Sequence, residues 1–197
     1  MALFTLPPTP PRADLELENF LRGKKMEHPI GRYKRMLAPE WFPQSGVQLT
    51  WPHADTDWAY MLPEITALYQ RLAYEIATRE LLLIIAPDTE SVRRHLEEQL
   101  PKRATDNIIY IDCPTNDTWA RDHAFLSVLD TGKPELLDFG FNGWGGKFEA
   151  AADNAINHCV YASGRLAGSY IDCLDFILEG GSIESDGCGT ILTTKAC

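Results

Sequence analysis

The chain has 197 residues, of which 45% are hydrophobic and 10% aromatic, and it carries a formal net charge of −10. This composition excludes a disordered chain, because its apolar and aromatic side chains need a packed core. The negative charge argues against a nucleic-acid partner, since phosphates are bound by cationic side chains. We expect this charge to keep the protein soluble rather than to attract cationic ligands.

The first 36 residues differ from the rest. Prolines cluster between Pro7 and Pro11, and basic residues follow between Arg22 and Arg35. We expect residues 1–36 to be an N-terminal extension, flexible or partly helical, ahead of a domain over 37–197. The extension lacks the continuous apolar segment of a secretory signal, and no stretch of the chain reaches 18 apolar residues. We therefore expect a cytoplasmic protein without membrane contact.

Strands and helices alternate beyond the extension and predict an α/β fold. A helix opens at Pro63, with apolar residues at three- and four-residue spacing after it. The continuous apolar run Leu81–Ala86 predicts a strand buried on both faces. A second helix should carry Val92, Leu96 and Leu100. Further strands are expected at 48–51, 108–113, 124–129, 136–141, 176–178, 182–185 and 190–194, with a helix over 149–161 and a hairpin turn at Asp186-Gly187.

The sequence Tyr-Ile-Asp-Cys occurs twice, at 110–113 and at 170–173. Each copy is followed by an acidic residue shortly before a predicted strand, Asp122 in the first case and Glu179 in the second. A repeat architecture would direct both carboxylates at one centre. The repeated tetrapeptide and the two acids together favour such an arrangement.

Residues 116–123, Asn-Asp-Thr-Trp-Ala-Arg-Asp-His, form the segment richest in functional groups. Asp122 and Trp119 are the residue types that bind a planar cation, by two hydrogen bonds and by an aromatic face. The alternative is a polar turn with an Asp–Arg pair. Glu179 precedes two glycines, which either allow a ligand close to the backbone or mark a bend.

Other potential sites are weaker. The segment Trp51-Pro52-His53, with Asp55 and Trp58 after it, brings aromatic surface close to acids, but core packing explains these aromatic residues at least equally well. The segment 143–147 matches neither a Walker loop nor a dinucleotide-binding pattern. The histidines lack metal-ligand spacing and the five cysteines lack C-x-x-C spacing, so we expect no metal site and no disulfide framework.

Five segments together resemble the agmatine deiminase and bacterial-type (Porphyromonas-type) peptidylarginine deiminase family. They follow the family's order and lie at 39–41, 51–53, 116–123, 139–147 and 179–190. The resemblance implies a pentein fold, an α/β propeller of pseudo-repeated blades, incomplete in this chain. It assigns residues 37–197 to the N-terminal part of the catalytic domain.

The resemblance also implies the chemistry, hydrolysis of a guanidinium group to a ureido group with release of ammonia and no cofactor. In this family a Cys thiolate attacks the guanidinium carbon, and a His acts as general acid and base. Asp122 matches the carboxylate that grips the guanidinium, and Glu179 matches the acid that supports the His or the substrate. Trp119 matches an aromatic residue of the pocket, with Asn142 and Trp144 as further substrate-binding candidates.

Agmatine is the expected substrate and N-carbamoylputrescine the expected product. Peptidyl-arginine is the alternative, but the loop at 142–147 has no arginine to hold a terminal carboxylate. The family's catalytic His and Cys follow the Glu179 segment, and His123 and Cys197 do not stand in those motifs. We therefore expect this chain to be inactive alone, with a second copy or a complementing chain as its protein partner. The alternative of another class is a non-catalytic binding or assembly fragment.

Overall fold

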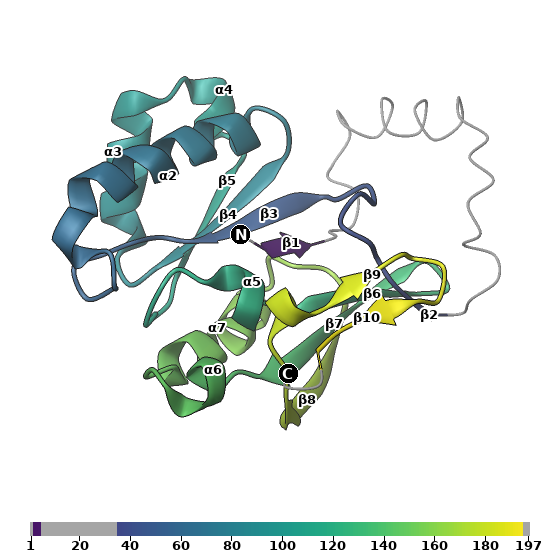
Figure 1. The fold of residues 1–197 in the computed structure, drawn as a ribbon. Helices are drawn as coiled ribbons and strands as arrows, with labels where there is room; N and C mark the ends of the chain where they lie inside the picture. Colours follow the sequence, from purple (N-terminus) through teal and green to yellow (C-terminus); the bar gives the residue numbers. More distant parts are fainter. Residues whose placement is uncertain (1, 5–34, 195–197) are drawn as a thin grey trace.

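The computed structural model describes residues 2–4 and 35–194 (Figure 1). Strand β1 (Ala2–Phe4) and strand β2 (Arg35–Leu37) join separate sheets, and residues 5–34 of the expected extension lie outside the described residues. The described strands form two open four-stranded sheets and a two-stranded ribbon, so the α/β class is confirmed while no closed propeller is formed. No helix in the described ranges has the length and apolar character needed to cross a membrane.

The first sheet has the order β1-β3-β4-β5, in which β3 (Gly46–Thr50), β4 (Leu81–Ala86) and β5 (Ile108–Asp112) run parallel and β1 is antiparallel. Helices α2 (Leu62–Ala77), α3 (Thr89–Gln99) and α4 (Lys102–Thr105) gather on one face (Figure 1). The predicted strand β4 is confirmed residue for residue.

Strand β4 lies at the centre of the hydrophobic core because its alternate side chains enter two clusters. Leu82 and Ile84 pack beneath the helices, together with Leu96 of α3. Leu83 and Ile85 pack on the opposite face, against Ile156 of helix α7 (Ala151–Ala162). A strand buried on both faces has no polar face, which explains its uninterrupted apolar sequence.

The second sheet has the order β2-β6-β7-β8, formed by β2, β6 (Leu126–Asp130), β7 (Lys133–Gly140) and β8 (Ser169–Ile177). Strands β7 and β8 are parallel and are connected by α7, whereas the other pairs are antiparallel. The predicted hairpin at Asp186-Gly187 is confirmed, because β9 (Glu184–Ser185) and β10 (Ile191–Leu192) pair antiparallel around it.

The two Tyr-Ile-Asp-Cys copies occupy corresponding places. Tyr110 lies on β5, which pairs in parallel with β4 across the crossover helix α3. Tyr170 lies on β8, which pairs in parallel with β7 across the crossover helix α7. A short helix follows each copy, α5 (Ala120–His123) in one half and the 3-10 helix η3 (Gly180–Ser182) in the other. These two short helices contact each other, which brings the Asp122 and Glu179 segments together. That both carboxylates are directed at one centre stays a prediction.

The strand expected over 190–194 is shortened to β10 (Ile191–Leu192), the part that pairs with β9. Two further expected strands differ from the observed elements. The strand expected over 176–178 is the end of β8, which begins at Ser169 because residues 169–173 pair with residues 135–139 of β7. The strand expected over 182–185 is shortened to β9, because η3 occupies its start. In both cases contacts with a distant segment, rather than local apolar patterning, determine the boundary.

Candidate functional site

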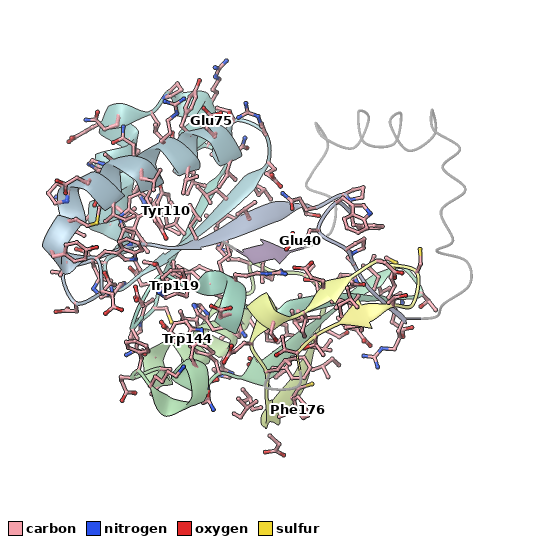
Figure 2. All side chains as sticks on the ribbon, in the orientation of Figure 1. Glu40, Glu75, Tyr110, Trp119, Trp144 and Phe176 are labelled. Atoms are coloured by element: carbon pink, nitrogen blue, oxygen red, sulfur yellow. The ribbon has the colours of Figure 1, made fainter. Side chains whose placement is uncertain are left out.

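A cavity of about 300 Å³ lies where the turn after β3, the start of α5 and the loop at 142–148 converge. Three residues named from the sequence line it, Trp119, Asp122 and Trp144, and the lining also includes Asp57 and Phe148. Trp119 precedes α5 and Trp144 lies in α6 (Gly143–Gly146), and Figure 2 labels both beside this part of the fold. Two carboxylates and three aromatic side chains therefore share one opening.

The aromatic wall is continuous from one side of the cavity to the other. The ring centroids of Trp119 and Trp144 lie 6.3 Å apart, and those of Trp144 and Phe148 lie 5.7 Å apart, both pairs in edge-to-face geometry. Trp58 extends the wall, with its ring 6.2 Å from that of Trp119. Edge-to-face packing stabilises each pair by about 0.5–1.5 kcal/mol beyond the buried area.

Trp119 is held in place by Asp117. The indole Nε1 of Trp119 donates to Asp117 Oδ2 at 3.1 Å, and the backbone amide of Thr118 donates to Asp117 Oδ1 at 2.8 Å. Asp117 is buried, and burial raises the pKa of its carboxyl group, although these hydrogen bonds oppose the shift. The Asp117 carboxyl group thus orients the ring that faces the cavity.

The loop that carries Asp117 is in turn attached to α7. The backbone amide of Asn116 donates to Asp153 Oδ1 at 2.7 Å, and the Asn116 side chain accepts from the amide of Ala152 at 2.8 Å. The Asn116 oxygen thereby satisfies amides at the start of α7 that have no partner within the helix, and Asp153 in return satisfies amides of the loop. Burial raises the pKa of Asp153 to about 6.

Asn142 shapes the loop that presents Trp144. Its Oδ1 accepts from the amide of Gly145 at 2.8 Å, and the Asn142 side chain does not line the cavity. Trp144 has φ 59° and Gly143 has φ 65°. Position 143 requires glycine, because a side chain there would overlap the Phe148 carbonyl. A left-handed conformation is unfavourable for Trp, and the Trp144 ring lines the cavity from this loop. A direct contact of Asn142 with substrate stays a prediction.

Asp122 is available to a ligand because its neighbour Arg121 is engaged elsewhere. Arg121 pairs with Glu40 at 2.9 Å and donates to the carbonyl of Ile183 at 3.2 Å, with Glu184 at 3.9 Å. Among the residues that the structure describes, no cationic side chain lies within ion-pair distance of Asp122. The expected alternative, a turn closed by an Asp–Arg pair, is not formed.

The Glu179 segment lies against α5 through its two glycines. A side chain on Gly180 would approach the Arg121 carbonyl to 2.5 Å, and one on Gly181 would overlap the Asp122 carboxylate. The Glu179 carbonyl accepts from the amide and hydroxyl of Ser182 at 3.0 and 2.7 Å. The glycines therefore permit close approach between segments, while a role for the Glu179 carboxylate stays a prediction.

The histidine beside Asp122 and the cysteines of the described residues lie outside this cavity. His123 is buried against Phe141, and burial lowers its pKa to about 3, so it is neutral. Burial likewise raises the pKa of Cys113 to about 12, which keeps it a thiol. Over 2–4 and 35–194, no Cys or His lines the cavity and no group of three metal-ligating side chains occurs.

Two lining residues, Asp57 and Phe148, are absent from the sequence-based candidates. The aromatic and acidic segment after Trp51 drew attention to Asp55 and Trp58, yet the acid between them is the one at the cavity. Trp51 itself is buried against Tyr69 with ring centroids 5.6 Å apart, as the core explanation expects. The sequence feature that could have identified Asp57 as a cavity residue is its position next to Trp58, but this feature alone does not distinguish Asp57 from Asp55.

Comparison with known proteins gives one consistent result. A family model described as Porphyromonas-type peptidyl-arginine deiminase matches residues 36–197. A protein of Selenomonas ruminantium, named as a proposed agmatine deiminase, is 34% identical over 168 residues, which are 82% of this chain and 44% of that protein. The agmatine deiminase of Pseudomonas putida is 32% identical over 170 residues, with the same shares of 82% and 44%.

Solved structures agree with these relatives. A crystal structure from Porphyromonas gingivalis, described as a proposed arginine deiminase, is 45% identical with a TM-score of 0.73 and is matched over 83% of this chain and 48% of that one. The C. jejuni agmatine deiminase with substrate bound is 33% identical with a TM-score of 0.70, over 81% and 45%. The chain spans less than half the length of each of these four relatives.

Proposed function

The chain belongs to the Porphyromonas-type peptidyl-arginine deiminase family, and from this membership we propose that it carries the guanidinium-binding part of an agmatine deiminase. The observation that supports this function is the cavity in which Asp57 and Asp122 face three aromatic rings. A guanidinium ion is planar and weakly hydrated, so it stacks on aromatic faces and accepts a carboxylate in its plane. The lining contains no cationic side chain that would compete with a guanidinium for Asp57 or Asp122.

The proposed reaction converts agmatine and water to N-carbamoylputrescine and ammonia. A Cys thiolate adds to the guanidinium carbon, ammonia leaves with a proton from the catalytic His, and water then hydrolyses the amidino-cysteine. In this scheme Asp122 holds the guanidinium, Trp119 and Trp144 cover it, and Glu179 supports the His or the substrate. The thiolate and the His are not among the residues that line the cavity, so we propose that this chain alone does not turn over substrate.

The proposed architecture of the whole protein is a propeller of pseudo-repeated blades. Two units of the chain support it, since β4-α3-β5 and β7-α7-β8 have the same parallel crossover and each leads into a short helix. The two short helices meet near the cavity. In a propeller of such units, each blade would contribute one such segment to a central site.

Agmatine is favoured over peptidyl-arginine by the charge of the cavity. Agmatine is a dication, and the lining offers two carboxylates without an arginine that would hold a peptide carboxylate. A complete deiminase that contains this chain should therefore hydrolyse agmatine faster than a peptide that ends in arginine. Ammonia release measured with both substrates tests this preference, and faster turnover of the peptide would reverse it.

Binding is testable on the chain itself. Calorimetry should detect agmatine, and D122N should weaken its binding about tenfold or more, because hydrogen bonds to charged groups contribute about 1.5–3 kcal/mol. D55N is the matched control, since it removes an equal charge from a nearby residue that does not line this cavity. If agmatine gives no heat at millimolar concentration, or if D122N binds it as well as the unmodified chain does, the proposed function fails.

A second candidate function, assembly with another chain, is favoured by exposed apolar side chains. Phe176 on β8 and Leu192 on β10 are 61% and 67% exposed, and Ile191 is 57% exposed. Exposed apolar side chains on strands of this kind promote association. Light scattering of the chain alone should detect a species larger than one chain, and a single monomeric species would remove assembly with a second copy.

A further inference from the structure

Asp57 is an exposed acid whose two neighbours in the chain are each held by a side-chain hydrogen bond. It lies in the turn after β3, between the buried Thr56 and the partly buried Trp58. The Thr56 hydroxyl donates to the carbonyl of His53 at 2.8 Å, and the Trp58 indole donates to the Thr118 hydroxyl at 2.8 Å. These bonds hold the chain on both sides of Asp57, and Asp57 lies on the cavity wall.

The Asp57 carboxylate has no partner within the described part of the chain, in hydrogen bonds or in ion pairs. Some exposed acids elsewhere are paired, as Glu75 is with Arg79 at 2.7 Å and Asp106 with Lys102 at 2.7 Å, so what distinguishes Asp57 is its position on the cavity wall. The charge of Asp57 nevertheless reaches the site, because it contributes to the raised pKa of Asp117. An unpaired charge at a cavity that already contains Asp122 favours a ligand with more than one positive charge.

The two carboxylates differ in their exposure to solvent. Asp122 is partly covered, whereas Asp57 is exposed. A guanidinium ion is weakly hydrated and loses little by entering an aromatic, partly covered site, while an ammonium ion is compact and strongly hydrated. The guanidinium end of a dication is thus matched to Asp122 and the aromatic rings, and its ammonium end is matched to Asp57.

We propose that Asp57 is a specificity-determining residue, which binds the terminal ammonium group of agmatine while Asp122 binds the guanidinium group. The inference rests on the proposed function and names the group that selects among guanidine compounds. A guanidine compound whose other end is neutral loses the contact with Asp57, and one whose other end is anionic is repelled by Asp57. The chain therefore selects a dication by charge at the opening of the cavity as well as by the guanidinium itself.

Butylguanidine provides the test, because it keeps the guanidinium and the four-carbon chain of agmatine but lacks the ammonium. Calorimetry on the full chain gives the ratio of the two dissociation constants, butylguanidine over agmatine. D57N should lower this ratio about threefold to fivefold, the upper end of what an exposed ion pair contributes, and added salt should shrink the effect. D55N, which changes the net charge equally, should leave the ratio unchanged. D122N should weaken both ligands alike.

Each outcome decides between the alternatives. If D57N weakens both ligands equally, both carboxylates grip the guanidinium and the inference is overturned. If the ratio in D57N equals that of the unmodified chain, or if D55N lowers it as much, the inference is overturned while the proposed function stands. If the unmodified chain binds neither ligand, the proposed function itself fails. Circular dichroism establishes that D57N is folded, which its exposed position favours.

Discussion

Replacing Asp153 with Asn should change how the stability of this protein depends on pH. The buried Asp153 carboxylate accepts from the amide of Asn116 at 2.7 Å and, through Oδ2, from the amide of Asp117 at 3.1 Å. Burial outweighs these hydrogen bonds, and the like charge of Asp117 adds to it, so the pKa of Asp153 rises from 3.8 to about 6. The folded protein therefore binds this proton more tightly than the unfolded chain does.

The direction and size of the effect follow from that difference. A pKa raised by about two units corresponds to about 3 kcal/mol, at about 1.4 kcal/mol per unit. This stabilisation is fully present below the unfolded pKa of 3.8 and is lost as the pH rises through the folded pKa of about 6. The Asn side chain in Asp153→Asn is neutral at every pH. Its amide nitrogen replaces the oxygen that accepts from the backbone amide of Asp117, which lowers the free energy of unfolding by about 1 kcal/mol independently of pH.

The difference in free energy of unfolding, wild type minus Asp153→Asn, should fall by about 2 to 3 kcal/mol from about pH 4 to about pH 7. Urea denaturation followed by circular dichroism at several pH values measures it, because groups that titrate in both proteins cancel. Asp55→Asn, at an exposed side chain, should give a difference nearly independent of pH. A difference that stays flat or grows with pH would show that the hydrogen bonds outweigh burial, and would refute the reasoning.

Three further predictions concern the core, the contact between the two short helices and the exposed strands. Leu83→Ala should lower the free energy of unfolding by about 3–5 kcal/mol in urea denaturation, since Leu83 is fully buried, whereas the half-exposed Leu68 should tolerate Ala at less than about 1 kcal/mol. Gly181→Ala should displace the Asp122 carboxylate and weaken agmatine binding in calorimetry, and unaltered affinity would show that this contact does not position Asp122. Phe176→Lys should reduce self-association of the chain in light scattering, and unchanged association would locate the contact elsewhere.

Part of the candidate site could be predicted from the sequence because its residues are close neighbours in the chain. Trp119 and Asp122 lie in one eight-residue segment, and both line the cavity with Trp144. Asp57 and Phe148 could not be predicted, since a single exposed acid or aromatic residue forms no pattern of its own. They belong to the cavity only because the turn after β3 and the loop after α6 are brought to the start of α5.

By itself the sequence determined the elements that depend on local patterning. The continuous apolar run predicts β4, and the three- and four-residue spacing after Pro63 predicts α2. Only the tertiary structure decided that Arg121 pairs with Glu40 and leaves Asp122 to a ligand, and that β8 begins at Ser169. The physical reason is range, because periodicity acts through neighbours in the chain, whereas ion pairs and parallel strand pairing depend on which distant segments meet.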